Sequence, residues 1–264
     1  MTDIQTRINH LALALKVQDG LKYTPDAIEE SYLQRAKKIT EELTEMGIQT
    51  LTYLDEEFPE KLIDVTDCPK ILYVKSRTPL SELFKGKMVT IAGTRDQSMY
   101  GRDCCMHIVR TLADSPIRPT IVSGLALGID FTAHAAALEA GMKTIAVLPC
   151  GLDEVYPKVH APVAKKIATT PGCALISPFP PGTAPTAYNF LSRNLVIAAL
   201  SETIVIVETK QKGGANIIAR KAHELDRKVW AVPGRINDIR SAGCNELIGE
   251  GIADILCAKN MNDI

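Results

Sequence analysis

The sequence lacks the features that mark membrane, secreted and metal-binding proteins. No apolar run approaches the roughly 20 residues needed to cross a bilayer, and residues 1–7 lack the basic start and apolar core of a secretion signal. The seven cysteines are odd in number and show no C-x-x-C spacing, so they predict neither a zinc site nor a disulfide framework. We therefore expect a cytoplasmic protein with reduced thiols, no metal and no membrane contact.

The common nucleotide-binding signatures are missing as well. The first strand of the predicted sheet is followed by residues 93–101, which do not read G-x-G-x-x-G, and the chain has no Walker pattern. A nicotinamide cofactor and nucleotide hydrolysis are therefore disfavoured, and no cofactor is expected. His134 lies four residues after Asp130, on the same face of a predicted helix. One interpretation is that the two side chains form an acid/base pair. The other is that they act separately: Asp130 interacts with the free N–H groups at the helix start, and His134 donates a hydrogen bond to a buried carbonyl.

The net charge of −1 hides an asymmetry along the chain. Residues 24–64 hold 11 acidic and 4 basic side chains, whereas residues 209–240 hold 8 basic and 3 acidic ones. If either segment meets a polyanion, it should be the later one. The alternative is that both segments are simply solvated faces.

The order of apolar runs predicts an α/β fold: an extended Rossmann-like, mostly parallel sheet with helices on both faces, preceded by a small, mainly helical N-terminal region. We place the N-terminal region at residues 1–80 and the Rossmann-like domain at residues 81–264. Strands are predicted at residues 88–92, 119–122, 144–148, 174–176, 203–207 and 228–232. Helices are predicted at about residues 101–113, 128–139, 162–168, 191–200 and 215–225.

Glycine and basic residues follow these strands, at the sheet edge where ligands of such folds bind. Glycine turns expose backbone N–H groups and helix starts to anions, although a single such turn is more often structural. Phe190 and Arg193 at a helix start suit a stacked base and a phosphate, or else a helix staple and an ion pair. Besides Phe190 and Arg193, the residues predicted to bind DNA or phosphate lie in these loops. They are Gly93, Thr94, Arg95, Ser123, Gly124, Gly128, Lys210, Lys212, Gly213 and Gly214.

These motifs together resemble the DprA/Smf family of DNA-processing proteins, from about residue 53 onward. The resemblance rests on Gly93-Thr94-Arg95, Ser123-Gly124-Leu125-Ala126, Gly128-Ile129-Asp130, Phe190, Arg193-Asn194 and Gly213-Gly214-Ala215. It implies a non-enzymatic, dimeric protein that binds and protects single-stranded DNA and loads the RecA recombinase in natural transformation. The DNA-contacting residues that it implies are Gly93, Thr94, Arg95, Ser123, Gly124, Phe190, Arg193 and Asn194.

The chain departs from the family pattern at two positions. Leu127 and Leu195 stand where the family often has arginine, so two cations are missing from the expected site, with Lys210, Lys212 and Arg220 as candidate substitutes. Two alternative functions remain: a nucleotide-acting enzyme resembling the phosphoribohydrolases, and an interaction protein that has kept the scaffold and binds DNA weakly. The sequence leaves open the dimer interface, the RecA contact and the competence of the host.

Overall fold

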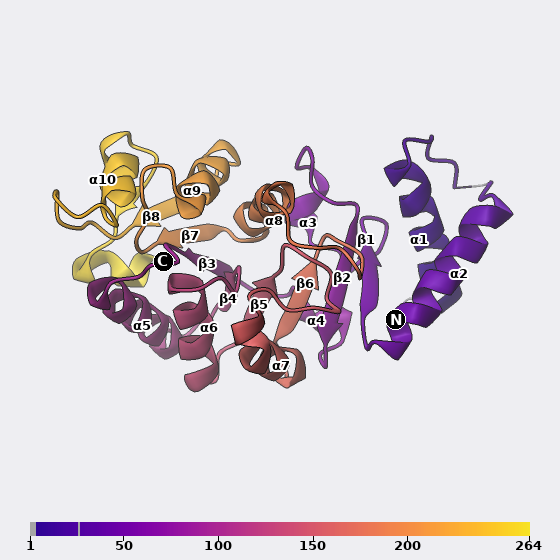
Figure 1. The fold of residues 1–264 in the computed structure, drawn as a ribbon, viewed down its shortest axis with the longest axis horizontal. Coiled ribbons are helices and arrows are strands. Elements are labelled where there is room, and N and C mark those ends of the chain that lie inside the picture. The colour runs from indigo at the N-terminus through magenta and orange to yellow at the C-terminus, as the bar shows by residue number, and fades with distance from the viewer. Residues whose placement is uncertain (1–3, 26) are drawn as a thin grey trace.

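The computed structural model describes residues 4–25 and 27–264. Its centre is a nine-stranded sheet with the order β1-β2-β6-β5-β4-β3-β7-β8-β9 (Figure 1). The strands are β1 (Gln49–Thr52), β2 (Ile71–Ser76), β3 (Met88–Ala92), β4 (Thr120–Ser123), β5 (Thr144–Val147), β6 (Ala174–Ser177), β7 (Thr203–Ile206), β8 (Lys228–Ala231) and β9 (Asp254–Ile255).

The helices form a layer on each side of this sheet. In Figure 1, α5, α6 and α7 lie below the sheet and α8, α9 and α10 lie above it. The α-helices are α1 (Ile4–Gln18), α2 (Glu30–Glu45), α3 (Glu60–Ile63), α4 (Leu80–Leu83), α5 (Met99–Asp114), α6 (Ile129–Glu139), α7 (Ala161–Thr169), α8 (Ala187–Leu200), α9 (Gly214–Glu224) and α10 (Ala242–Gly249). The two 3₁₀ helices are η1 (Lys158–His160) and η2 (Ala258–Asp263).

The predicted fold class is confirmed. Strands β3 to β9 are parallel wherever they pair, as in β3 with β4, where Val89 lies opposite Ile121. The antiparallel exceptions are β1 with β2 and β2 with β6. Both β1 and β2 precede the predicted domain boundary at residues 80 and 81, so the sheet itself continues across that boundary.

The burial of the strands explains the sequence pattern that predicted them. Every residue of β3, β4, β5, β6 and β7 is buried, because helices cover both faces of the sheet. A strand covered on both faces needs a continuous apolar run rather than alternation, and β3 reads Met-Val-Thr-Ile-Ala. The hydroxyl of Thr90, the one polar side chain in that run, hydrogen-bonds the Ile197 carbonyl at 3.2 Å and the Ser201 hydroxyl at 2.9 Å.

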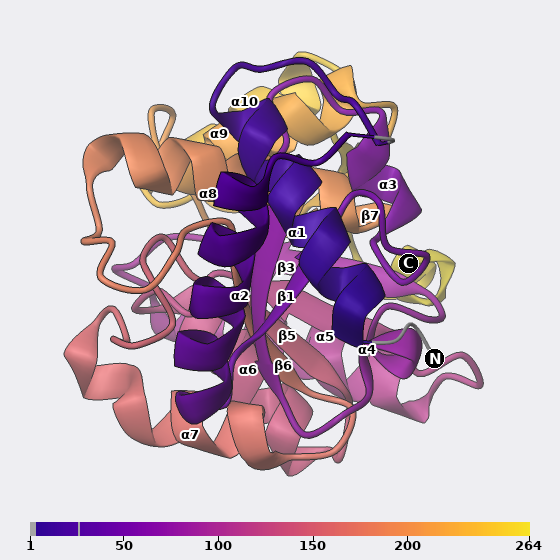
Figure 2. The ribbon, with the colours of Figure 1, turned by 90° about the vertical axis from the view of Figure 1, so that its right-hand side faces the viewer.

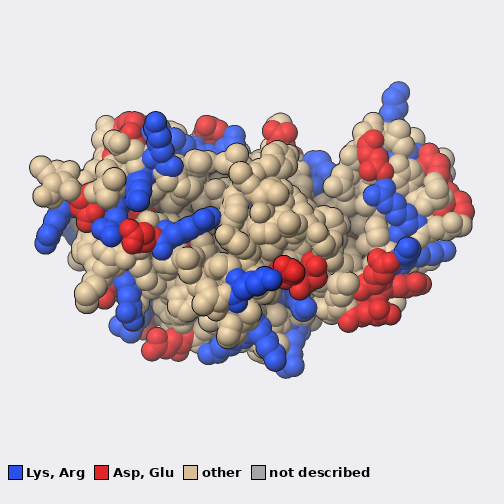
Figure 3. All heavy atoms as spheres, viewed as in Figure 1, with Lys and Arg blue, Asp and Glu red and all other residues tan. Residues whose placement is uncertain are grey.

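The N-terminal helices α1 and α2 pack on each other and lie across β1 at one end of the sheet (Figure 2). Arg7 of α1 reaches Glu57 at 2.9 Å, and His10 reaches Asp55 at 2.8 Å, so polar contacts tie α1 to the loop after β1. Helix α2 buries only Ala36 and Leu43. Acidic side chains gather over this end of the molecule, on the right of Figure 3, with several Lys and Arg side chains among them.

Two features predicted from the N-terminal region concern residues that the structure leaves undescribed. Residues 1–3 belong to the segment in which sequence analysis finds no secretion signal, and they lie outside the described part of the chain. Asp26, one of the 11 acidic residues in the segment 24–64, lies outside it as well. Within the described residues, no helix is long and apolar enough to span a membrane.

Candidate functional site

The candidate site lies where the order of successive strands reverses within the sheet, between β3 and β7. Strand β3 pairs with β4 on one side and with β7 on the other. The chain leaves β3 through α5 toward β4, but leaves β7 through α9 toward β8. Such a switch point opens a crevice beyond the carboxyl ends of the two strands.

A cavity of about 680 Å³ occupies this crevice. Its walls are the loop after β3, the first half of α8 and the start of α9. Most of the predicted site residues line it, namely Gly93, Thr94, Arg95, Phe190, Arg193, Asn194, Lys210, Gly213 and Gly214. The predicted residues outside its lining are Ser123, Gly124, Gly128 and Lys212.

Arg95 and Phe190 form the exposed face of the site. The Arg95 guanidinium carbon lies 4.8 Å from the centre of the Phe190 ring, within the range of a cation–π contact. Tyr156 meets the same ring edge-on, with 5.7 Å between ring centres. Arg95 is exposed and Phe190 is half-buried, so the ring is partly covered by the protein while the cation is open to solvent.

Arg193 differs from Arg95 because it is almost wholly buried, with 4% of its surface exposed. Its Nη1 donates to the carbonyls of Gly124 at 2.8 Å and Val147 at 3.0 Å, which follow β4 and end β5. Burial lowers the pKa of Arg193 to about 10 and raises the pKa of the nearby Asp130 carboxyl. Arg193 therefore joins loops from inside the protein, and its Nη1 is occupied by these carbonyls.

The turn from Ser123 to Gly128, which sequence analysis predicts as part of the phosphate site, is largely filled by the protein itself. The Ser123 hydroxyl is buried and donates to the Ile91 carbonyl at 2.6 Å. At the start of α6, the Ile129 N–H donates to the Thr94 carbonyl at 3.2 Å. A Cβ on Gly124 would stand 1.8 Å from Arg193 Nη1, and a Cβ on Gly128 would stand 2.3 Å from Thr94 O. These glycines permit close packing, and little of the turn is open to an anion.

The start of α9 is open instead. The N-cap residue of this helix is Gly213, which has no side chain to accept a hydrogen bond from the first N–H groups. A Cβ on Gly214 would meet nothing closer than Asn194 Nδ2 at 4.0 Å. No acceptor for the N–H groups of Gly214 and Ala215 is recorded among the described residues. The positive end of the helix dipole thus faces the cavity beside Lys210. Lys212 is exposed on the same turn but lies outside the cavity lining.

Much of the positive charge predicted for residues 209–240 is neutralised by ion pairs. Four of its eight cations contact carboxylates: Arg220 with Glu250, Lys221 with Glu224, Lys228 with Asp254 and Arg240 with Asp96. Arg220 is therefore not a free substitute for a missing arginine. Of the basic side chains in this segment, Lys210 is the one that lines the cavity.

The two leucines that replace family arginines have different surroundings. Leu195 is 8% exposed and packs into the core beneath α8, so this position does not line the cavity. Leu127 is 46% exposed and adjoins Ala126, which lines the cavity. Only Leu127 therefore stands next to the cavity at the place of a missing cation.

Two groups that could act as an acid or base near the site, His134 and Glu208, make hydrogen bonds inside the protein. His134 is fully buried, its Nδ1 lies 2.7 Å from the Thr144 hydroxyl, and burial lowers its pKa to about 3. His134 therefore contacts Thr144, and no hydrogen bond joins it to Asp130 among the described residues, as in the alternative in which the two side chains serve separately. Glu208 is also buried and accepts hydrogen bonds from the Ser98 N–H at 2.9 Å and the Ser98 hydroxyl at 2.5 Å. Among the described residues, no group of three or more His, Cys, Asp or Glu could hold a metal ion.

The cavity also includes residues that sequence analysis did not identify. Leu191 and Ile217 line it from α8 and α9, and both are exposed. Leu191 directly follows Phe190, and Ile217 lies three residues after Gly214. Apolar residues on helices are usually core residues, so their exposure could be recognised only in the structure.

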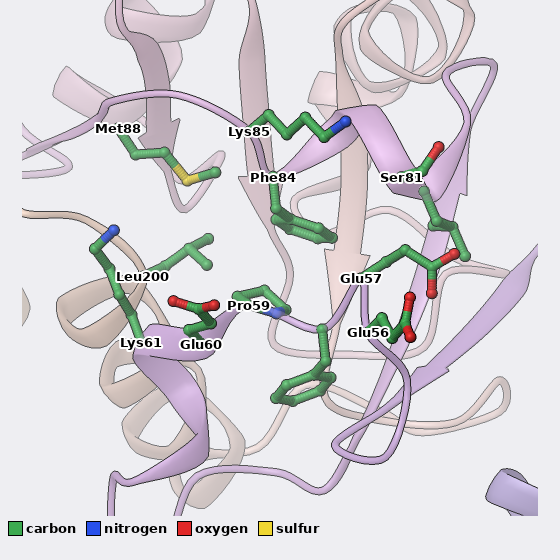
Figure 4. A pocket seen from close by; sticks show the side chains of 12 residues that line it. Glu56, Glu57, Pro59, Glu60, Lys61, Ser81, Phe84, Lys85, Met88 and Leu200 are labelled. Atoms are coloured by element: carbon green, nitrogen blue, oxygen red, sulfur yellow. The ribbon is translucent and has the colours of Figure 1, made fainter. Parts of the chain in front are cut away.

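A second cavity of about 410 Å³ lies at the opposite end of β3, where Met88 and Leu200 form part of its floor (Figure 4). Phe84 and Pro59 add apolar surface, and Glu56, Glu57 and Glu60 bring carboxylates to its rim. Lys61 at this rim pairs with Glu202 at 2.5 Å. The carboxylates make this cavity a poor site for a polyanion compared with the one between β3 and β7.

Comparisons with known proteins identify the family of this chain. Residues 49–264 match the family model described as DNA recombination-mediator protein A. The chain is 33% identical to DNA processing protein DprA of Bacillus subtilis, covering 88% of this chain and 76% of that protein. It is 36% identical to DprA of Streptococcus pneumoniae, covering 76% of this chain and 69% of that protein.

Solved structures show the same relationship. The crystal structure of DprA from Streptococcus pneumoniae superposes with a TM-score of 0.77 at 29% identity, covering 96% of this chain and 91% of that chain. DprA from Helicobacter pylori, described for its single-stranded DNA binding mode, superposes with a TM-score of 0.72 at 32% identity, covering 82% and 94%. Because the family model and these relatives span most of its length, this chain belongs to the DNA recombination-mediator protein A family.

Proposed function

We propose that this chain binds single-stranded DNA in the cavity between β3 and β7. The observation that supports it most is the combination of Arg95 over the Phe190 ring with the open start of α9 and Lys210. Cations and free N–H groups bind phosphates, and an aromatic ring stacks with a base. A lone nucleotide needs only one phosphate-binding group and one stacking ring, whereas a strand can use several of each along its length.

In this proposal Phe190 stacks on a base and Arg95 binds a phosphate. The contact between Arg95 and Phe190 is exposed and costs only about 0.5–1 kcal/mol to break. The N–H groups of Gly214 and Ala215 bind a second phosphate with Lys210 beside them. A duplex hides its base faces, so the site favours single strands.

The proposed role is that of a binding protein and not of an enzyme. Glu208, in the loop after β7, is buried and accepts hydrogen bonds from Ser98. The carboxylates that line the cavity are Asp96, which contacts Arg240, and the buried Asp130. From the family membership we propose further that the protein acts as a cytoplasmic dimer, protects DNA taken up in transformation and loads RecA on it. These finer roles rest on the resemblance to DprA/Smf proteins.

Fluorescence anisotropy with a labelled oligonucleotide at several salt concentrations tests DNA binding. We expect Arg95→Ala to weaken binding about tenfold and to lower the salt slope by about one, because one phosphate contact is lost. Phe190→Leu should weaken binding by a similar factor without changing the slope. Lys165→Ala, an exposed cation on α7, is the matched control. Equal affinity for single and double strands, with both site variants silent, would contradict the proposal.

RecA loading needs a separate assay. We expect the protein to speed the assembly of RecA on a single-stranded oligonucleotide at limiting RecA concentration, and Arg95→Ala to lose this effect. The mass in sedimentation tests the dimer. Normal DNA binding with no effect on RecA assembly would leave a DNA-binding protein and remove the loading role.

A further inference from the structure

A further hollow lies beside helices α8 and α9, next to the cavity at β3 and β7. It has a volume of about 560 Å³ and is lined by Tyr188, Leu191 and Ile217, among others. Its apolar side chains are unusually exposed, at 74% for Tyr188, 54% for Leu191 and 44% for Ile217. A contiguous patch of exposed apolar side chains often marks a binding surface, whereas a single exposed apolar residue needs no such explanation.

The hollow is continuous with the proposed DNA site. Leu191, Asn194 and Ile217 line both of them. Tyr188 and Phe190 are two positions apart on α8, so their side chains leave the helix on different sides, about 200° apart. The exposed side chain of Leu191 lies in the surface that connects the two rings.

The charges around this hollow largely cancel. Lys221 contacts Glu224 at 2.9 Å, and Arg220 contacts Glu250 at 2.7 Å. The hollow thus offers an aromatic ring and apolar surface but little net charge for a phosphate. Its contribution to binding a strand would come from base contacts, unlike that of Arg95 and Lys210.

We propose that Tyr188 is a second stacking platform for the same single strand. The strand leaves Phe190, crosses α8 over Leu191 and places a later base on Tyr188. This inference rests on the proposed function, since it extends the path of the bound DNA. The contribution of Tyr188 to DNA affinity should then depend on the length of the oligonucleotide and not on the salt concentration.

The test measures affinity for oligothymidylates of increasing length. For the wild-type protein, affinity should rise with length until the strand reaches Tyr188. Tyr188→Ala should bind the shortest oligonucleotides normally but long ones about tenfold more weakly, because one stacked base is lost. Its salt slope should equal that of the wild type, whereas Arg95→Ala should lose about one unit of slope. Tyr188→Phe keeps the ring and should restore binding.

Tyr23→Ala is the matched control, because Tyr23 is 48% exposed and lies in the loop between α1 and α2. If wild-type protein binds no oligonucleotide, the proposed function itself fails. If Arg95→Ala weakens binding while Tyr188→Ala matches Tyr23→Ala at every length, only the second platform is overturned. A change of sedimentation mass in Tyr188→Ala with unaltered DNA affinity would also overturn it, in favour of a protein interface.

Discussion

Two glycine-rich turns from strand to helix look alike in this sequence but differ in the structure. The turn before α6 packs Gly124 against Arg193 and Gly128 against the Thr94 carbonyl, so the chain itself fills it. In the turn before α9, the space around Gly214 is open, and the start of α9 faces the cavity. The comparison shows that glycine after a strand allows close approach, and the surroundings decide whether protein or ligand makes that approach.

The largest expected effect is that of Gly128→Ala in the filled turn. Gly128 has a φ of 76°, which disfavours a side chain, and the new Cβ would stand 2.3 Å from Thr94 O. We expect a loss of about 3 kcal/mol in the free energy of unfolding, measured by urea denaturation. Gly249→Ala, with nothing within 4 Å of its Cβ, is the control. A stable Gly128→Ala variant would show that this turn is not tightly packed.

Arg193→Met should also destabilise the protein, by about 3 kcal/mol. It leaves the carbonyls of Gly124 and Val147 buried without their charged donor. Urea denaturation measures the loss, and Arg95→Ala should leave stability unchanged because Arg95 is exposed. Unchanged stability combined with lost DNA binding would instead identify Arg193 as a phosphate ligand.

The packing around α6 also predicts a pH dependence. The pKa of buried His134 is lowered to about 3, so below its ordinary value of 6.5 the unfolded chain binds a proton that the folded chain does not. This group stabilises the fold above pH 6.5 and loses that contribution as pH falls, by about 2 kcal/mol at pH 5. The raised pKa of Asp130 acts in the opposite direction.

Comparing unfolding curves at pH 7 and pH 5 isolates the contribution of His134. We expect His134→Gln to lose less stability over this interval than the wild type does. The exposed His107, changed to glutamine in the same way, should leave the pH dependence as it was. Parallel losses in wild type and His134→Gln would mean that His134 is protonated in the folded protein.

The smallest expected effect is that of Gly214→Ala in the open turn. The new methyl group meets only Asn194 Nδ2, at 4.0 Å, and α9 tolerates alanine at its start. Stability should change by less than about 0.5 kcal/mol, while DNA affinity should fall a few-fold because the methyl group projects toward the cavity. A large loss of stability would remove the contrast between the two turns.

The sheet was predictable because strands covered on both faces must be apolar throughout. The runs at 88–92 and 203–207 identified β3 and β7 to within one residue of each end, and the loops after them identified one wall of the cavity. Burial of particular polar residues was not predictable in the same way. Arg95 and Arg193 are the same residue type and both lie beside the Phe190 ring, at 4.8 and 5.6 Å from its centre. Only the structure shows that Arg193 is buried and bonded to backbone carbonyls whereas Arg95 is an exposed cation.

The sequence by itself determined the fold class, the family and the sheet edge where the site lies, because apolar periodicity and glycine placement are local properties of the chain. Tertiary structure decided which glycine turn is open, which cations are free and which apolar residues are exposed. Those properties depend on contacts between segments far apart in the chain, such as Gly124 with Arg193 or Thr94 with Ile129. No local pattern encodes such contacts, since each is set by how the surrounding segments pack.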